Sequence, residues 1–407
     1  MGVTARTEAD PSAAWLRDRL EELCAIERPS ASPGERRAAD WLARELREAG
    51  ARDVRIEEEP EANGTFWWPL GLLAGAGALA GLAARRGGRL SRALATVTGA
   101  AAAALAADEM PPGGRTFRRL LPQRTCHHVL AELGSEEAER TIVVMAHHDA
   151  PHSAFFFNPA ITETVGEAAP WVFENNDTSP PLMWPVVAGP AVVAAGAALG
   201  SRRLTDLGIL LSAGTAAFMA DIGFTEAVPA ANDNGTGCVA LIALARSLAE
   251  NPPDGARVLL LSTSEEALCE GMGLFMERHA ADLPRDRTFF LCLDTLGSPH
   301  LLVLRGEGML KLREYPRASL ELLDSAADEL GIDLFPNLRL RNATDAVFPL
   351  AAGYQCASVA SCNQWKNPSN YHWKTDTPEN VRYETLGDAI RLSEAVIRRL
   401  DADWLNG

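Results

Sequence analysis

Hydrophobic and polar positions follow two different patterns along this chain. Over most of its length, short apolar runs alternate with stretches in which apolar residues recur every three or four positions. The short runs predict strands and the recurring positions predict amphipathic helices, so an α/β domain is expected. The expected strands are residues 53–58, 126–133, 141–146, 257–261 and 288–293, and the expected helices are residues 13–27, 34–49, 236–250, 271–281, 316–331 and 384–401.

The second pattern consists of longer runs, rich in alanine, glycine and leucine, that interrupt the first in two places. Each interruption holds two such runs around a short basic turn, which predicts a helical hairpin. In the first hairpin, Gly71 and Gly75 have the spacing that lets helices approach closely. We therefore expect a single domain over residues 1–407 with insertions at residues 64–122 and 152–227. The apolar runs are residues 66–84, 93–107, 184–200 and 207–220.

Both hairpins are expected at the same end of the sheet. If the first three strands pair antiparallel in chain order, the first and the third run in the same direction. The chain then leaves residues 53–58 and residues 141–146 at one edge, and an insertion begins after each. The two hairpins would pack there into a four-helix apolar cap that narrows access to this edge.

The apolar runs approach the length that crosses a bilayer. Two of them have about 17–19 residues and two about 14–15, where about 20 are needed. Trp67, Trp68 and Trp184 lie at run ends, as interfacial aromatics do. No secretory signal is found at the N-terminus, which favours a membrane-associated protein with its α/β domain in the cytoplasm. The arginine turns would then break the positive-inside rule, so a soluble cytoplasmic Ala/Gly-rich bundle stays an alternative.

Composition and charge exclude some classes of protein. The hydrophobic share of 47% and charged share of 23% are typical of a globular chain. A net charge of −16 argues against nucleic acid as a partner, because phosphate binding needs a basic surface. The seven cysteines form no CxxC pair, which indicates reduced thiols and the cell interior.

Acidic and histidine residues follow three of the expected strands immediately. His147 and Asp149 come after residues 141–146, Glu265 and Glu266 after the strand that begins at residue 257, and Asp294 after residues 288–293. Ligands bind at the carboxyl ends of strands in α/β sheets, so these side chains should meet in one crevice. Taken singly, each has a structural explanation as a buried hydrogen-bonded histidine, a solvated helix start or a strand-end cap.

Two further residues complete this group. Asp233 lies in a glycine-rich loop before the helix 236–250, where the helix N-terminus stabilises a carboxylate. Taken alone, Asp233 would be interpreted as a helix cap and His372 as a surface residue. Together, two histidines and several carboxylates suit a divalent site, most plausibly zinc, with enough donors for two ions.

Five ordered motifs in the chain resemble the M28 family of zinc aminopeptidases. The similarity covers residues 12–60, 124–151 and 228–400. It implies a three-layer α/β/α sandwich with a mixed, largely parallel central sheet. It also implies a di-zinc metallohydrolase that cleaves an amide or peptide bond, an aminopeptidase or dipeptidase for small or apolar substrates. The motifs are His147-x-Asp149, residues 231–237 around Asp233, Ser264-Glu265-Glu266, residues 293–297 around Asp294, and residues 371–380 around His372.

The resemblance implies a role for each site residue. Asp233 would bridge two zinc ions, with His147 and Asp294 on one ion and Glu266 and His372 on the other. As the catalytic pair, Asp149 would orient His147, and Glu265 would be the general base that takes a proton from the attacking water and passes it to the leaving amine. The family often has a cis peptide bond after the bridging aspartate, here between Asp233 and Asn234; no side-chain role is implied for Asn234.

The chain departs from the family pattern at two positions. His148 stands where the family usually has an aromatic or aliphatic residue, and it could compete as a ligand unless strand alternation turns it away. Ala346 stands where the family often has histidine, which puts the usual substrate contacts in doubt. Two alternatives therefore stay open, namely a one-zinc aminoacyltransferase similar to glutaminyl cyclase and a non-catalytic membrane or receptor-like relative. The side-chain preference, the choice between peptide and N-acyl amino acid, and the oligomeric state are left open.

Overall fold

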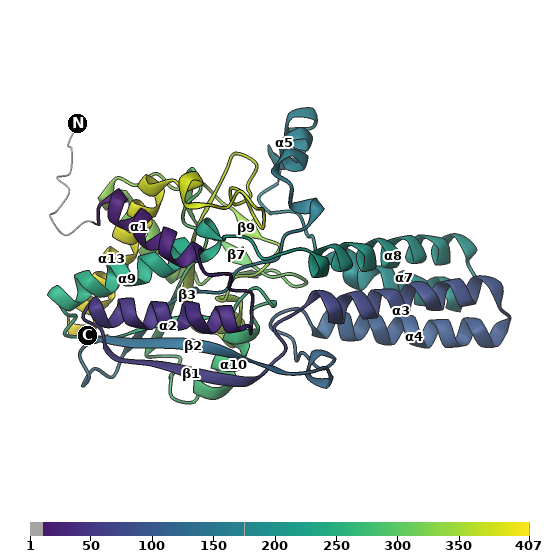
Figure 1. The fold of residues 1–407 in the computed structure, drawn as a ribbon, viewed down its shortest axis with the longest axis horizontal. Coiled ribbons are helices and arrows are strands. Elements are labelled where there is room, and N and C mark those ends of the chain that lie inside the picture. Colours follow the sequence, from purple (N-terminus) through teal and green to yellow (C-terminus); the bar gives the residue numbers. More distant parts are fainter. Residues whose placement is uncertain (1–10, 175, 407) are drawn as a thin grey trace.

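A mixed seven-stranded sheet forms the centre of the part of the chain described by the computed structural model, residues 11–174 and 176–406 (Figure 1). The first ten residues, where no secretory signal is predicted, lie outside these ranges. The strand order is β1-β2-β4-β3-β5-β10-β6, and β7, β8 and β9 form a small second sheet. The strands are β1 (Arg52–Ala62), β2 (Arg124–Gly134), β3 (Thr141–His147), β4 (Arg257–Thr263), β5 (Thr288–Leu293), β6 (His300–Val303), β7 (Gly306–Glu307), β8 (Arg313–Glu314), β9 (Arg339–Leu340) and β10 (Gln355–Cys362).

The central sheet is largely parallel, as predicted. β4, β3, β5 and β10 pair side by side in parallel, and β2 and β6 run against them. The predicted pairing of β2 with β3 is wrong, because β4 lies between them. β3 is buried along its whole length and takes a central place that its apolar sequence suits. β1 still runs in the same direction as β3, so both insertions leave the sheet at one edge.

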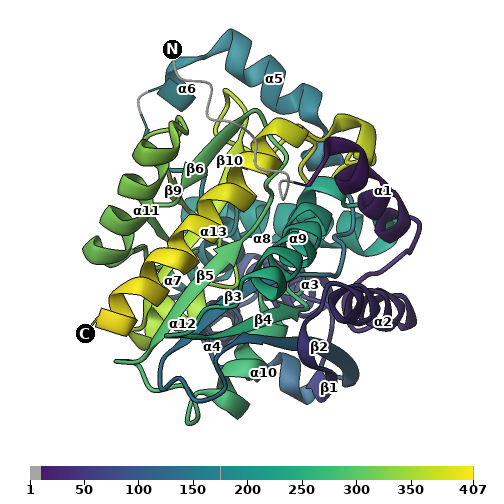
Figure 2. The ribbon, with the colours of Figure 1, turned by 90° about the vertical axis from the view of Figure 1, so that its left-hand side faces the viewer.

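Helices cover both faces of the sheet and give the predicted three layers (Figure 2). Alternate residues of β3 divide between the two cores: Ile142 and Val144 face one, Val143 and Met145 the other. The expected helices and strands are all present within a few residues of their predicted bounds. The first face is covered by α1 (Ala13–Cys24), α2 (Pro33–Glu48), α9 (Thr236–Glu250), α11 (Arg317–Leu330) and α13 (Tyr383–Asn406), and the second by α10 (Glu270–His279) and α12 (Val347–Ala352).

The two insertions supply four long helices that pack as one bundle. These helices are α3 (Trp67–Arg86), α4 (Arg89–Asp108), α7 (Trp184–Leu199) and α8 (Arg202–Phe224). The bundle projects away from the edge of the sheet, and only its base borders the α/β domain (Figure 1). This orientation differs from the expected cap, because the helices continue outward from the strand ends instead of folding back over them.

The bundle is close-packed inside and apolar outside. A Cβ on Gly208 would lie 2.5 Å from the backbone nitrogen of Val193, so only glycine permits this helix contact. Large side chains such as Leu79, Leu90 and Leu210 are about 70% exposed. Among the described residues, α3, α4 and α8 are long and apolar enough to cross a membrane, and α7 is a shorter apolar helix.

The rest of the second insertion connects β3 to the bundle helix α7. It contains the turn η2 (Phe155–Phe157) and the helices α5 (Pro159–Ala168) and α6 (Trp171–Glu174). The first insertion ends in the short turn η1 (Arg118–Leu120). Sequence patterns did not predict these short elements, nor β6, β10 and α12.

Candidate metal centre

Three neighbouring strands each lead into predicted site residues. His147 is the last residue of β3, and Asp149 follows two positions later. Glu265 and Glu266 come shortly after β4, and Asp294 directly after β5. β4, β3 and β5 are adjacent and parallel, so their carboxyl ends bring these side chains to one edge of the sheet.

The remaining two residues come from loops. Asp233 lies in η3 (Ala231–Gly235), directly before α9, and its peptide bond to Asn234 is cis, as in the family that the motifs resemble. His372 lies in the segment between β10 and the turn η4 (Pro378–Asn380). Both are buried or nearly so.

These residues form two sets of metal-binding side chains that share one aspartate. In the first set, Nε2 of His147 lies 3.3 Å from Oδ1 of Asp233 and 3.8 Å from Oδ1 of Asp294. In the second set, Nε2 of His372 lies 3.3 Å from Oδ2 of Asp233 and 3.4 Å from Oε2 of Glu266. Asp233 therefore offers one oxygen to each set.

The donor atoms fit a divalent cation. Nε2 of His147 and Oε1 of Glu266 are buried, and within the described residues neither has a hydrogen-bond partner. Such an atom costs on the order of 1–3 kcal/mol if nothing binds it. Burial raises the pKa of Glu266 well above its usual range, and the carboxylates of Asp233 and Glu265 raise it further. A cation relieves that repulsion, and imidazole with carboxylate is a donor mixture that zinc binds.

Asp149 orients His147 through Nδ1, the ring nitrogen that does not belong to the metal-binding set. Oδ1 of Asp149 lies 3.1 Å from Nδ1 of His147. Burial opposes ionisation, but hydrogen bonds from His147 and from neighbouring donors lower the pKa of Asp149 to about 2. The carboxylate thus keeps the proton on Nδ1 and leaves Nε2 free to bind a metal. Its other hydrogen-bond donors are Ser30 Oγ, Ser264 Oγ and the backbone N–H groups of Glu265 and Glu266.

Two side chains with no role assigned from sequence fix the loop of Asp233. Asp376 accepts the backbone N–H groups of Asn232 at 2.7 Å and Asp233 at 3.0 Å. Asn234 donates through Nδ2 to the carbonyl of Leu293 at 2.8 Å, which ties the loop to the end of β5. The bridging carboxylate is therefore held from both sides.

Glu265 lies beside the metal-binding sets and lines the adjoining cavity. Cys269 donates its thiol to Oε1 of Glu265 at 3.0 Å. Burial raises the pKa of Glu265 well above its usual range; His147 opposes this shift, and the carboxylates of Asp345 and Asp294 reinforce it. A carboxyl group whose proton affinity is raised in this way is suited to general acid–base work.

His148 points away from this centre. Its Nδ1 pairs with Ser262 Oγ at 2.9 Å and its Nε2 with Glu35 Oε1 at 3.2 Å. Strand alternation sends His147 and His148 to opposite sides, so His148 belongs to neither metal-binding set. Its contacts link β3 to β4 and α2.

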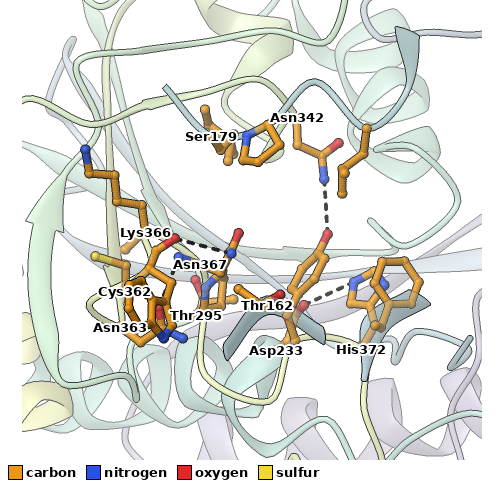
Figure 3. A pocket seen from close by; sticks show the side chains of 18 of the residues that line it. Thr162, Ser179, Asp233, Thr295, Asn342, Cys362, Asn363, Lys366, Asn367 and His372 are labelled. Atoms are coloured by element: carbon orange, nitrogen blue, oxygen red, sulfur yellow. Dashed lines mark hydrogen bonds and ion pairs between the residues drawn. The ribbon is translucent and has the colours of Figure 1, made fainter. Parts of the chain in front are cut away.

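A cavity of about 380 Å³ leads from the two sets toward the bundle (Figure 3). Asp233 and His372 border it, with Asn342 on another wall. The ring of Tyr371 stacks on His372 with centroids 3.8 Å apart, and its hydroxyl accepts a hydrogen bond from Asn342 at 3.0 Å. These contacts fix the plane of the His372 imidazole.

Sequence reasoning missed several residues that position the centre. The guanidinium of Arg28 is fully buried and donates to the carbonyls of His148, Pro229 and Ala230. Cys269 and Tyr371 also carried no assigned role. Tyr371 and Asp376 stood inside the recognised motif of residues 371–380, so that motif was the available signal for them. Cys269 contacts Glu265 within the same short segment, whereas the contacts of Arg28 with His148, Pro229 and Ala230 join segments far apart in sequence.

Comparison with known proteins agrees with this geometry. Residues 215–397 match the family model described as Peptidase family M28. Two similar solved structures are BSAP, a zinc aminopeptidase from Bacillus subtilis (15% identity, 97% of this chain and 96% of that chain, TM-score 0.54), and a Zn-dependent exopeptidase from Parabacteroides distasonis (14%, 96% and 98%, 0.54). A Bacteroides thetaiotaomicron glutaminyl cyclase is equally similar (13%, 95% and 97%, 0.55). No curated protein matches by sequence.

The sequence identity between these solved structures and this chain is below a fifth, so their similarity shows the fold alone. The family match supports zinc hydrolase chemistry, because the matched range contains five of the site residues, namely Asp233, Glu265, Glu266, Asp294 and His372. A zinc-type donor set at the carboxyl ends of parallel strands is what such a hydrolase requires. The match of residues 215–397 to peptidase family M28 therefore supports a zinc-dependent metallopeptidase of that family.

Proposed function

We propose that the protein is a di-zinc aminopeptidase or dipeptidase that acts on small or apolar substrates. One observation carries the proposal: two complete three-residue donor sets share Asp233, which turns one oxygen toward each. A buried carboxylate flanked in this way is arranged to bridge two cations. The cavity beside it is large enough for a small molecule and too confined for a folded protein.

Each set would hold one zinc ion. His147 and Asp294 complete one site and Glu266 and His372 the other, with Asp233 in common. When bound, zinc lowers the pKa of water and polarises a substrate carbonyl. Asp149 keeps the imidazole of His147 in the correct tautomer, and Tyr371 stacks on the ring of His372.

Glu265 is the residue that moves the proton. Its carboxylate accepts a proton from the attacking water and returns it to the leaving amine nitrogen. Two contacts hold it in place: its backbone N–H donates to Asp149, and its Oε1 accepts from Cys269. No histidine stands at Ala346, which is buried, so Ala346 provides no polar substrate contact.

A second function, cyclisation of N-terminal glutamine with a single zinc ion, has a specific observation in its favour. Solved glutaminyl cyclases share this fold at the same level as the peptidases. The set of Asp233, Glu266 and His372 has three donors by itself, which is enough for one zinc ion.

Metal content measured with activity separates the two functions. We expect two zinc ions per chain and hydrolysis of amino-acid anilides or dipeptides, with loss of both on chelation. One tightly bound zinc ion with cyclisation of glutaminyl peptides would replace this proposal by the second. His148→Gln is a matched control for His147→Gln, since only His147 belongs to a donor set.

We also propose that the bundle enters a lipid bilayer while the α/β domain stays in the cytoplasm. The exposed leucines of α3, α4 and α8 support insertion, and helices of 20 residues span about 30 Å. All seven cysteines are free, which is typical of a reducing compartment. Labelling of cysteines introduced at the turn between α3 and α4 in intact cells tests this placement, which requires that turn to be outside.

A further inference from the structure

A row of aromatic rings connects the surface at the base of the bundle to the metal-binding sets. Phe156 in η2 is 48% exposed, and its ring lies 5.6 Å from that of Phe218 in α8. Phe218 lies 5.9 Å from Phe157, and Phe157 lies 4.8 Å from His372. All of these rings line the same cavity. An apolar path therefore runs from the outside of the protein to a metal-binding side chain.

The cavity has an apolar half on the side of the bundle and a second half that includes polar residues, with the shared aspartate between them. On the side of the bundle its walls include Phe66, Ile222, Leu268 and Met309. On the other side, Thr295, Asn363 and Asn367 line the cavity together with apolar residues such as Leu302 and Leu304. Asp233 lies between the three polar residues and His372 (Figure 3). This division suits a substrate that is apolar on one side of the scissile bond and polar on the other.

The apolar half opens at the level where the bundle would meet a membrane surface. Trp68 at the start of α3 and Phe224 at the end of α8 are exposed and pack against each other at 5.4 Å. Trp184 at the start of α7 is also exposed, and its Nε1 donates to the carbonyl of Met309, a residue of the cavity wall. Exposed aromatics at one end of apolar helices are typical of a membrane interface. Phe156 marks this opening, because it is exposed, lines the cavity and packs on Phe218 of α8, the helix that ends in Phe224.

We propose that the substrates are N-acyl amino acids with long acyl chains, taken from the bilayer through this opening. This inference rests on the proposed zinc hydrolase. The acyl chain occupies the apolar half, the amide lies at Asp233 and the amino-acid head contacts Asn363 and Asn367. Hydrolysis consumes one water: the C–N bond breaks, the hydroxyl group goes to the acyl carbon, and the proton carried by Glu265 goes to the amine nitrogen.

The test measures kcat/KM of the zinc-loaded full chain for N-acyl glycines from acetyl to palmitoyl in mixed micelles, with amino-acid anilides in parallel. We expect kcat/KM to rise at least about tenfold from the short to the long acyl chains, as apolar pockets discriminate chain length. Anilide hydrolysis without any rise with chain length would overturn this inference and leave the proposed function standing. Protein that holds zinc and cleaves neither class would overturn both.

Two substitutions test the apolar path from the surface to His372. Phe156→Ser and Phe218→Ser should lower the ratio of palmitoyl to acetyl kcat/KM by about tenfold, because each removes an apolar wall. Phe155→Ser is the matched control, since Phe155 is the exposed neighbour of Phe156 and does not line the cavity. An equal change in the Phe155 variant would assign the effect to micelle binding and overturn the path.

Discussion

Large apolar side chains point inward in the α/β domain, whereas many of those in the four-helix bundle point outward. Phe290 and Leu130 are fully buried between sheet and helices, whereas Leu79 and Leu210 stand about 70% exposed along the bundle. The interior of the bundle combines small residues such as Gly208 with a few large ones such as Leu70 and Met219. The α/β domain is therefore stabilised by the removal of apolar surface from water, whereas the bundle leaves a large apolar surface exposed.

Buried charged side chains also connect the four-helix bundle to the α/β domain. Arg118, just after the first hairpin, donates to Glu109 at the end of α4 at 2.9 Å, and both are about 1% exposed. Glu270 at the start of α10 accepts the backbone N–H groups of Asn63 and Gly64. Arg118 also donates to the carbonyl of Ala267, one residue after Glu266. The base of the bundle is thus linked to the segment after β4 that carries Glu265 and Glu266.

The chemistry belongs to the α/β domain, and Glu265→Gln tests this most strongly. The amide cannot accept the proton, so kcat should fall by about 10³-fold while zinc content stays unchanged. Metal analysis together with single-turnover rates measures both quantities. Glu167→Gln, which changes an exposed residue of α5 that does not line the cavity, is the control. Retained turnover in the Glu265 variant would remove it from the role of base.

The apolar surface of the bundle is tested by Leu79→Asp. A charge near the middle of α3 should disfavour bilayer insertion by about 3 kcal/mol, roughly 10²-fold in partitioning. Flotation with phospholipid vesicles measures the change. Leu120→Asp alters a residue that is equally exposed but lies outside the four helices, and it should leave flotation unchanged. Equal behaviour of the two variants would argue for a soluble bundle.

Packing inside the bundle is tested by a pair of glycines in α8. Gly208→Ala forces a Cβ to within 2.5 Å of Val193 and should cost about 1–3 kcal/mol of unfolding free energy. Gly214→Ala meets nothing within 4 Å and should be neutral or stabilising by up to about 1 kcal/mol. Thermal unfolding in detergent compares them. A destabilised Gly214 variant would contradict this packing.

The last prediction concerns the pH dependence caused by a buried acid of the α/β domain. Burial raises the pKa of Glu307 to about 8 from 4.5, and hydrogen bonds from Thr344 and Tyr315 oppose the shift. The folded state therefore holds a proton that the unfolded state has lost, and stability falls as pH rises from about 4.5 to 8. Glu307→Gln should remove this dependence in urea unfolding. Glu314→Gln, which is exposed, should keep it; equal slopes in both variants would refute the shift.

Much of the site could be predicted because its residues follow local signals. His147, Glu266 and Asp294 each follow an apolar strand, and parallel strands must bring such positions to one edge. The order of the motifs along the chain then identified Asp233 and His372 as further metal-binding residues. The helices and strands were predicted for the same reason, since apolar periodicity is a property of neighbouring residues.

The sequence by itself determined the strand ends, the metal-binding residue types and the apolar hairpins. Only the tertiary structure decided that β4 separates β2 from β3, that the bundle projects outward, and that Phe156, Phe157 and Phe218 line one path to His372. These contacts join segments that are far apart along the chain. Periodicity carries no information about such partners, because packing alone selects them.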